Sequence, residues 1–470
     1  MAKEKAERQH PPTLDPDYRN KNFEEVEQNF TKEQAALEAS RCLQCKNARC
    51  VKGCPVNIDI PGFITKVSEG NIDEAGKIIR NSSLLPSVCG RVCPQERQCE
   101  GACVVGIKDK PVAIGCLERY VGDNSSAEKV DLPQSGQKVA VIGSGCAGIS
   151  AAADLAKAGH KVTVFEALHS LGGVLRYGIP EFRLPRTALD RELNNLVEMG
   201  VEFKKNVIIG KSLSINDLKE DGFDAIFICS GAGLPKMLEI SGENFNGVFS
   251  ANEFLTRVNL MRANRPETPT PIRFGRKCAV FGGGNTAMDA ARTAKRIGFD
   301  NVTIVYRRTE AELPARKAEI EHAKEEGVEF LFLHAPLEII GENGYSKAVK
   351  LQVMELGEPD ESGRRRPVAI KDNIVDIEFD TVIVALGTNP NPIIQRSAVE
   401  EGMDLQVDRR GYIIVDKETG LTNLDGVYAG GDVAPVGESN AINAMGAGKK
   451  AAKAINEYLA AKKTAACCSK

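Results

Sequence analysis

The chain has 470 residues, a formal net charge of −3, 42% hydrophobic residues and no tryptophan. The near-balanced charge and the few aromatic residues give no support for binding to nucleic acid or to an anionic membrane surface. The sequence has no run near the roughly 18 apolar residues of a membrane span, and its start, Met1-Ala2-Lys3-Glu4-Lys5, lacks a signal-peptide core, so we expect a cytoplasmic protein.

The first part of the chain is expected to be mostly helical. Residues 1–30 are polar and include three prolines, which predicts a flexible arm. Thr31 is a suitable N-cap for a helix over 32–41, and further helices are expected at 60–69 and 72–80. A polar linker is expected from Asp123 to Gly136.

Eight of the fourteen cysteines lie in two runs within this helical part. The runs are Cys42-x2-Cys45-x4-Cys50-x3-Cys54-Pro55 and Cys89-x3-Cys93-Pro94-x4-Cys99-x3-Cys103. Closely spaced thiols followed by proline are typical of iron–sulfur ligation. Disulfides belong to small secreted domains. Zinc ribbons use C-x2-C pairs, of which the runs contain only Cys42/Cys45. We therefore expect two [4Fe–4S] clusters.

The first dinucleotide-binding motif is Gly143-Ser144-Gly145-Cys146-Ala147-Gly148, which follows a buried strand at 139–142 and begins a helix. In such a motif Gly143 makes the tight turn, Gly145 admits the pyrophosphate and Gly148 lets the helix pack on the strand. The next strand ends at Glu166, which is placed to accept hydrogen bonds from ribose hydroxyls.

Two later segments indicate that this first site binds FAD. Gly172 and Gly173 follow the acidic residue, and Gly431-Asp432 follows a strand near the end of the chain. Asp432 is placed to bind the ribityl chain, although a turn or capping residue is the alternative. A helix beginning near Ala441 would direct its positive end at the flavin.

The second motif, Gly282-Gly283-Gly284-Asn285-Thr286-Ala287, again lies between a strand and a helix. The strand after it ends without an acidic residue and is followed by Arg307 and Arg308. Arginines favour a 2′-phosphate through charge-assisted bonds, so the motif predicts NADP(H) rather than NAD(H). The alternative is that both arginines simply face solvent. Further cofactor-site residues are expected at Leu175 and Gly387.

The order of the motifs predicts an α/β fold in which an NADP-binding Rossmann-like domain is inserted into an FAD-binding one, as in the disulfide-reductase class. The expected domains are a helical iron–sulfur domain at 1–130, the two parts of the FAD domain at 131–255 and 386–470, and the NADP domain at 256–385. Cys146, Cys229 and Cys278 are scattered, which favours packing over dithiol chemistry. The Cys467-Cys468 pair receives no assignment.

Several motifs together resemble the glutamate synthase small-subunit family. They are Cys89-Gly90-Arg91-Val92-Cys93-Pro94, Gly172-Gly173 through Phe182-Arg183-Leu184-Pro185, and Tyr306-Arg307-Arg308. The resemblance covers residues 32 to 460. The stretch from Cys50 to Ile64 is most similar to the ferredoxin:NADP oxidoreductase members of that family.

The resemblance implies how the cluster ligands are divided. One cluster would be bound by Cys42, Cys45, Cys50 and Cys103. The other would be bound by Cys54, Cys93 and Cys99 with Glu118 as a fourth ligand, while Cys89 would be a structural thiol. Cys116 is the rival for the fourth position, because the spacing departs by one residue from the family pattern.

The resemblance also implies a function. NADPH would reduce the FAD, and single electrons would leave through the clusters. Arg183 and Arg176 follow the Gly172-Gly173 turn and would lie against the flavin ring. The alternative for each is a salt-bridged surface arginine. The implied role is electron bifurcation, with one electron going to ferredoxin and the other to a small partner subunit that carries FAD and [2Fe–2S] and reduces NAD, in a heterodimer. The alternative is the small subunit of NADPH-dependent glutamate synthase. A zinc-bound scaffold with degenerate nucleotide folds is the non-enzyme alternative.

Overall fold

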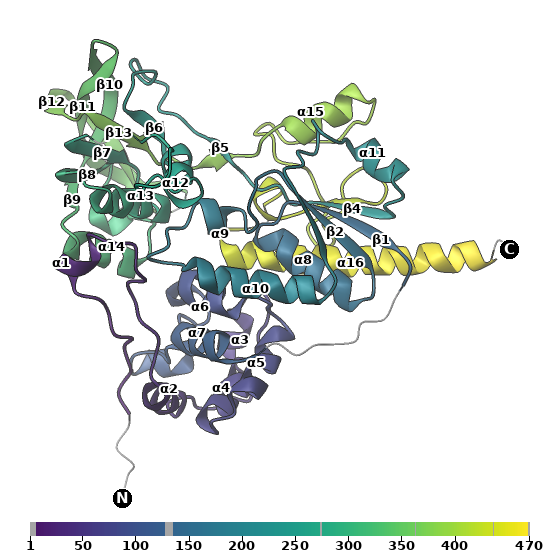
Figure 1. Ribbon diagram of the computed structural model, residues 1–470. Helices are drawn as coiled ribbons and strands as arrows, with labels where there is room; N and C mark the ends of the chain where they lie inside the picture. The colour runs from purple at the N-terminus through teal and green to yellow at the C-terminus, as the bar shows by residue number, and fades with distance from the viewer. Residues whose placement is uncertain (1–5, 127–134, 273–274, 362, 436, 469–470) are drawn as a thin grey trace, which may run out of the picture.

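The computed structural model describes residues 6–126, 135–272, 275–361, 363–435 and 437–468, with only the backbone of 465–468. Most of the expected linker and the side chains of Cys467 and Cys468 therefore lie outside the described residues. Figure 1 shows a helical unit that lies against two α/β units. In the described part of the chain, no helix has both the length and the apolar content that crossing a bilayer requires.

The helical unit consists of short helices joined by the cysteine-bearing loops. Thr31 caps the first of them as expected, because its side chain accepts a hydrogen bond from the Gln34 amide. The helices are α2 (Lys32–Ala39), α3 (Arg49–Lys52), α4 (Ile60–Ser68), α5 (Ile72–Arg80), α6 (Pro86–Val92), η1 (Gln95–Arg97), η2 (Val104–Ile107) and α7 (Ile114–Asn124).

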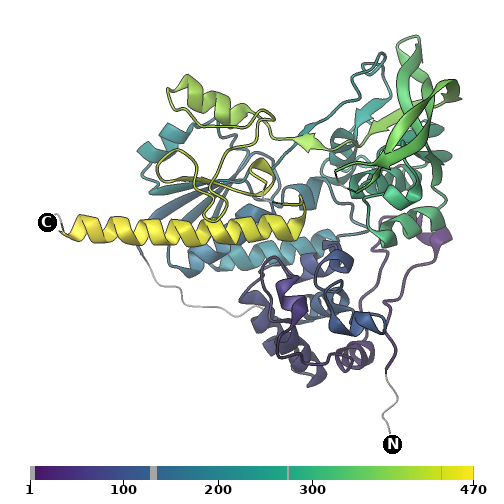
Figure 2. The same ribbon diagram turned by 180° about the vertical axis from the view of Figure 1, so that it is seen from behind.

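The first α/β unit is built on a parallel sheet in the order β15-β4-β1-β2-β3. The strands are β1 (Lys138–Ile142), β2 (Lys161–Glu166), β3 (Glu202–Lys205), β4 (Ala225–Ile228) and β15 (Val427–Ala429). Its helices are α8 (Cys146–Lys157), α9 (Val174–Tyr177), α10 (Arg186–Glu198), α11 (Ile215–Glu220), α15 (Ile393–Glu400), η4 (Gly431–Val433) and α16 (Ala441–Cys468). The long helix α16 packs along α8 and reaches the helical unit (Figure 2).

The second α/β unit repeats this arrangement with the sheet order β6-β13-β7-β8-β9. Its strands are β6 (Val248–Ser250), β7 (Lys277–Phe281), β8 (Asn301–Tyr306), β9 (Glu329–Phe332) and β13 (Thr381–Val384). Its helices are α12 (Ala251–Asn259), α13 (Asn285–Arg296), η3 (Glu310–Glu312) and α14 (Lys317–Glu325). An antiparallel sheet of β10 (His334–Glu342), β11 (Tyr345–Pro359) and β12 (Arg365–Glu378) extends from it.

Two short strands, β5 (Leu234–Pro235) and β14 (Thr388–Asn389), carry the chain out to the second unit and back. The fold thus contains the predicted insertion of one Rossmann-like unit into another. Strand β6 pairs with β13 and so belongs to the second sheet, although the expected division at residue 256 gives β6 to the first domain. We propose a boundary between β5 and β6.

The helical unit and the first α/β unit share one apolar core. Phe63, Leu85 and Leu117 of the helical unit are fully buried in the same cluster as Val139 and Leu189. Each such side chain contributes about 1.5–3 kcal/mol when removed from water. This shared core fixes the cysteine loops against the first nucleotide-binding unit.

The expectation of a flexible N-terminal arm is wrong for residues 6–30. The arm runs to the second α/β unit, forms α1 (Pro16–Arg19) beside α14 and returns to α2 (Figure 1). The Val26 amide donates to the Phe182 carbonyl (2.9 Å), and Arg19 is 1% exposed. Composition alone could not reveal this docking, because the partners of the arm lie about 150 and 300 residues away.

Arg19 joins a buried network of ion pairs. Its guanidinium donates to Glu326 (2.9 Å) and to Glu325 of α14, and Glu326 also accepts from Arg292 and Arg296 of α13. Burial alone would raise the pKa of Glu326, but the hydrogen bonds from Arg296 and Arg292 hold that pKa well below its usual value. The stabilisation is therefore present at neutral pH and is lost only as the pH falls through the acidic range.

The network predicts opposite outcomes for two substitutions. Arg19→Met leaves Glu326 paired with two arginines, so we expect the arm to detach and its cleavage by a protease to speed up with little change in Tm. Glu326→Gln leaves three buried guanidinium groups short of a charged partner and is expected to cost about 3–5 kcal/mol, read as a lower Tm. Arg276→Met, in the exposed pair with Asp300, is the control and should change neither measurement. An arm that stays equally resistant in Arg19→Met would contradict the role given to this arginine.

Candidate functional site

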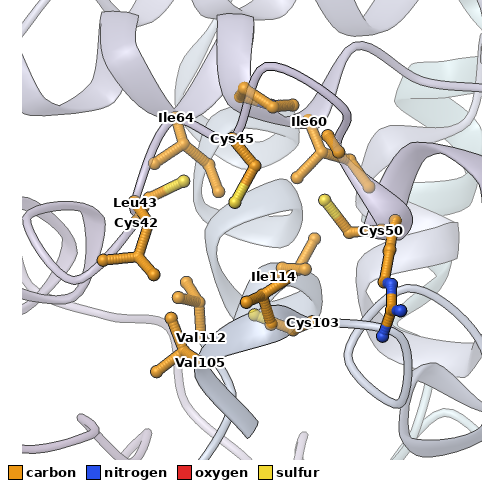
Figure 3. A pocket seen from close by; sticks show the side chains of 14 residues that line it. Cys42, Leu43, Cys45, Cys50, Ile60, Ile64, Cys103, Val105, Val112 and Ile114 are labelled. Atoms are coloured by element: carbon orange, nitrogen blue, oxygen red, sulfur yellow. The ribbon is translucent and has the colours of Figure 1, made fainter. Parts of the chain in front are cut away.

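Four thiols surround a small apolar cavity in the helical unit. Cys42 and Cys45 lie in the loop after α2, Cys50 lies in α3 and Cys103 precedes η2. Figure 3 shows their sulfur atoms around the cavity, with Ile60, Ile64 and Ile114 among its other lining residues. We call this group the first thiol site.

The first thiol site has the donor set that an iron–sulfur cluster needs, since four cysteines line one cavity. Burial raises the pKa of Cys50 to about 11, with a contribution from Cys103. Thiols bind metal as thiolates, so four of them around an apolar cavity fit a group whose positive charge displaces their protons.

Cys54, Cys93 and Cys99 form, with Glu118, a second thiol site that is more deeply buried. Burial raises the pKa of Cys54 to about 11, and the charge of Glu118 contributes to that shift. The charge of Glu118 also raises the pKa of Cys99, after the larger effects of burial and of Glu100. It likewise raises the pKa of Cys93, where the largest effect is the hydrogen bond with Cys89. The carboxylate is thus within electrostatic reach of all three thiols.

Glu118 has a buried carboxylate oxygen that lacks a hydrogen-bond partner among the described residues. Its side chain lies in α7, and its buried Oε1 makes no hydrogen bond. Burial raises the pKa of this carboxyl to about 8, with a contribution from Glu192. Buried polar atoms without partners are rare in folded proteins. A cluster at the three thiols would supply the missing partner.

Cys116 has different surroundings from Glu118. After burial, the groups that act on the pKa of Cys116 are Glu100, Glu27, Arg8 and Arg119, and none of the three thiols is among its principal neighbours. Of the two rival fourth ligands, Glu118 is therefore the one that interacts electrostatically with the three thiols, and its assignment as a ligand stays a prediction.

The first nucleotide loop (residues 143–148) has the backbone that its glycines predict. Gly143 has a φ of 116°, and a Cβ there would lie 2.6 Å from the Cys229 carbonyl oxygen. A Cβ on Gly148 would lie 2.0 Å from the Gly143 carbonyl oxygen, whereas a Cβ on Gly145 would have nothing within 4 Å. The loop is thus tight where helix packs on strand and open at the start of α8, where a pyrophosphate would bind.

Glu166 and the Gly172-Gly173 turn are joined by Ser144. The Glu166 carboxylate accepts from the Ser144 amide (3.0 Å) and hydroxyl, and the Ser144 hydroxyl accepts from the Gly172 amide (2.9 Å). A Cβ on Gly173 would come within 3.0 Å of Gly145 Cα, so the turn closes over the loop. Sequence analysis did not assign a role to Ser144, because a variable motif position carries no chemical signal. Leu175, in α9, is fully buried.

The segment near the C-terminus lies against the same loop. A Cβ on Gly431 would be 3.0 Å from the Ala147 Cβ. Further along the chain, α16 begins at Ala441. Burial raises the pKa of Asp432, while a hydrogen bond from the Ser439 hydroxyl opposes the shift. Asp432 is therefore brought to the first nucleotide loop, as a residue that contacts a flavin there must be.

Sulfur atoms connect this loop with the second thiol site. The Cys89 thiol lies 3.6 Å from the Met445 sulfur of α16. Burial raises the pKa of Cys146, at the start of α8, and Cys89 and then Asp432 contribute to that shift. Cys89 and Met445 therefore lie next to both the second thiol site and the first nucleotide loop, to which Cys146 belongs. The role of Met445 was not predictable from the sequence, because only the packing of α16 on α6 brings it here.

The second nucleotide loop (residues 282–287) repeats the backbone of the first. Gly282 has a φ of 146°, and a Cβ there would lie 2.4 Å from the Ala385 carbonyl oxygen. A Cβ on Gly283 would meet the Tyr306 ring at 2.7 Å, while the space around Gly284 is open. Asn285 and Thr286 begin α13. Gly387 lies at the crossover between the units, where its carbonyl accepts from the Lys236 amide (3.0 Å).

The paired arginines have different surroundings. Arg308 is 6% exposed and donates to the Arg365 carbonyl and to the Asp360 carboxylate, each at 2.7 Å. It therefore anchors the tip of the β11–β12 hairpin. Arg307 is exposed at the end of β8. Arg308 is thus engaged within the protein, and phosphate binding by Arg307 stays a prediction.

The arginines expected near a flavin ring are bound to carboxylates. Arg183 donates to Asp289 of α13 (2.7 Å) and to Glu319 of α14 (2.8 Å). Arg176 pairs with Asp190 and donates to the Leu171 carbonyl (2.7 Å). Arg183 thus links the first α/β unit to the second in this conformation. No sequence pattern predicted that Asp289 and Glu319 would be the partners of Arg183.

Two family models match successive parts of the chain. A family model described as dihydropyrimidine dehydrogenase domain II, 4Fe-4S cluster, matches residues 19–130, and one described as pyridine nucleotide-disulphide oxidoreductase matches residues 137–448. The solved structure of Mycobacterium tuberculosis FprA in complex with NADPH is 21% identical, with a TM-score of 0.57 over 70% of this chain and 86% of that one, which shows the fold alone.

Two curated relatives extend over nearly the whole chain. The glutamate synthase [NADPH] small chain of Halomonas elongata is 37% identical over 453 residues, which is 94% of each protein. The NADP(+)-dependent formate dehydrogenase subunit beta of Moorella thermoacetica is 37% identical over 88% of this chain and 60% of its own length. The chain therefore belongs to the pyridine nucleotide-disulphide oxidoreductase family, in the group of the glutamate synthase small chains, with a 4Fe-4S domain in front of its nucleotide-binding part.

Proposed function

We propose that the protein oxidises NADPH at the second nucleotide loop and delivers the electrons to a partner chain through two [4Fe–4S] clusters, held at the two thiol sites. The observation that carries this proposal is the position of Cys89, which is hydrogen-bonded to Cys93 of the second thiol site, lies 3.6 Å from Met445 of α16 and interacts with Cys146 of the first nucleotide loop. A redox path needs its cofactor sites to adjoin one another, and these contacts support such an arrangement.

The bound groups would supply the redox chemistry: a flavin takes electrons in pairs from a nicotinamide, and clusters carry single electrons. The chain would hold the flavin with residues 143–148, Glu166, Gly172, Gly173 and Asp432. The start of α16 would place a positive helix end near the flavin. Arg307 and the amides at the start of α13 would bind the phosphates of NADPH. The proposed role of Arg183 is to hold the two units together.

The exposed side of the first thiol site favours a docking partner. Its four thiols are half-buried, whereas those of the second site are buried, so the first site is nearer to solvent. Leu43 and Ile107 beside it are 59% and 67% exposed. The surrounding exposed basic residues are Lys46, Arg49, Lys52, Lys108 and Lys110. An acidic partner surface would complement this rim.

Two partner systems are candidates. The large amidotransferase chain of a glutamate synthase is favoured by relatives of nearly the same length that are small chains of that enzyme. Electron bifurcation to ferredoxin, and to NAD through a small FAD and [2Fe–2S] subunit, is favoured by the stretch from Cys50 to Ile64. Other relatives are beta subunits of different NADPH-linked enzymes, so the partner decides the product.

The electron-input proposal is tested on anaerobically purified protein. We expect bound FAD, acid-labile sulfide for two clusters, and bleaching of the flavin by NADPH far faster than by NADH. Ferredoxin reduction that requires both the small subunit and NAD would select bifurcation, whereas glutamate formation with a synthase chain would select the alternative. A colourless protein that does not react with NADPH would refute the proposal.

The fourth ligand of the second cluster is tested by paired substitutions. Glu118→Ala removes the only carboxylate assigned to that cluster, so we expect one of two EPR signals to change or vanish. Glu118→Gln retains an oxygen donor and should keep the cluster with a shifted potential. Cys116→Ser is the matched control from the same helix and should leave both signals unchanged. The reverse pattern would assign the position to Cys116.

The 2′-phosphate assignment is tested at Arg307. Arg307→Ser removes a charge-assisted bond worth about 1.5 kcal/mol or more, so KM for NADPH should rise roughly tenfold while KM for NADH stays constant. Arg308→Ser should instead lower Tm, because it releases the hairpin tip. Equal KM changes for both nucleotides would show that Arg307 does not recognise the phosphate.

A further inference from the structure

The segment after η3 lies along the second nucleotide loop. The Ala315 amide donates to the Gly283 carbonyl (3.1 Å), and the Arg316 amide donates to the side-chain oxygen of Asn285 (2.9 Å). Asn285 is the first residue of α13, directly after the open glycine position at 284. The backbone of Arg316 is therefore bonded to the helix end at which the phosphates of a nucleotide bind.

The side chain of Arg316 crosses to the helical unit. Its guanidinium donates to the Gln95 Oε1 (2.6 Å), to the Arg91 carbonyl (3.2 Å) and to the Glu96 carboxylate (3.2 Å). These three acceptors lie on either side of Cys93, which belongs to the second thiol site. A planar guanidinium bonded to several acceptors transmits position and orientation better than a flexible ammonium group would.

Gln95 in turn organises the loop that carries the thiols. It is 5% exposed, and its side-chain amide donates to the carbonyls of Cys89 (3.3 Å) and Gly90 (3.0 Å) at the end of α6. Its own carbonyl accepts from the amides of Gln98, Glu100 and Gly101. A displacement of Gln95 would therefore move the backbone between Cys89 and Cys99.

We propose that Arg316 is a positioning residue that couples occupancy of the NADP(H) site to the second cluster. The proposal rests on the proposed function, which places the nucleotide at 282–287 and the cluster at Cys54, Cys93, Cys99 and Glu118. Phosphates at the start of α13 would lie beside Asn285. Asn285 is hydrogen-bonded to Arg316, and Arg316 is hydrogen-bonded to Gln95. Two contacts thus separate the nucleotide loop from the cluster loop, and coupling of this kind acts equally in both directions.

The test measures the cluster loop rather than turnover. Hydrogen exchange of residues 89–103 in the oxidised, cofactor-loaded protein is recorded with and without NADP⁺. The EPR spectrum of the reduced second cluster is recorded with and without 2′,5′-ADP, which carries the 2′-phosphate but accepts no electrons, because NADP⁺ would oxidise the reduced protein. We expect the nucleotide to slow exchange in this loop and to shift the EPR signal in the unchanged protein. Arg316→Ala should abolish both responses, and Arg316→Lys, which retains charge but loses the fork, should weaken them.

Arg97→Ala is the matched control. Arg97 crosses the same interface, where it donates a hydrogen bond to the Pro314 carbonyl (3.0 Å). This bond involves neither Asn285 nor Gln95, so the removal of Arg97 should preserve both responses. If Arg316→Ala fails to fold, Arg316→Lys carries the comparison.

Two results would overturn the inference: NADP⁺ binding without a response in the unchanged protein, or Arg316 variants that respond as the unchanged protein does. Failure of the proposed function looks different, because NADPH would then leave the flavin of the unchanged protein oxidised.

Discussion

The arrangement of the three units depends on buried pairing between arginines and glutamates. Glu326 accepts from Arg19 of the arm and from two arginines of α13, and Glu319 accepts from Arg183 of the first α/β unit. Removing the Glu326 carboxylate would leave three buried arginines short of a charged partner, which costs several kcal/mol. The network therefore holds the arm, the first unit and the second unit in one geometry, and the alignment of the nucleotide loops follows from it.

A second constraint keeps the thiols next to the first nucleotide loop. The helical unit and the first α/β unit have a common apolar core, and α16 brings Met445 to Cys89 across it. Because this core is continuous, the cluster loops cannot shift independently of α8 and α16. The second thiol site is buried, whereas the first is half-buried and has the exposed basic residues beside it.

Local patterns were enough to predict much of the fold. The helix cap at Thr31, the two glycine motifs and the insertion of one Rossmann-like unit into another follow from residues close in sequence, and the structure contains all three. The docking of the arm, the carboxylate partners of Arg183 and the different environments of Arg307 and Arg308 were not predictable. Each depends on a partner more than fifty residues away, and spacing along the chain carries no information about such partners.

The crossover formed by β5 and β14 has a mechanical consequence. Only these two short strands carry the backbone between the α/β units, so by covalent connection alone the second unit could swivel about them. A swivel would separate Arg19 from Glu326 and Arg183 from Asp289 at once, and both pairs are almost wholly shielded from water. The backbone of the crossover could therefore bend, but the buried ion pairs hold the two units in place. Because these pairs are shielded from solvent, salt should weaken this restraint little.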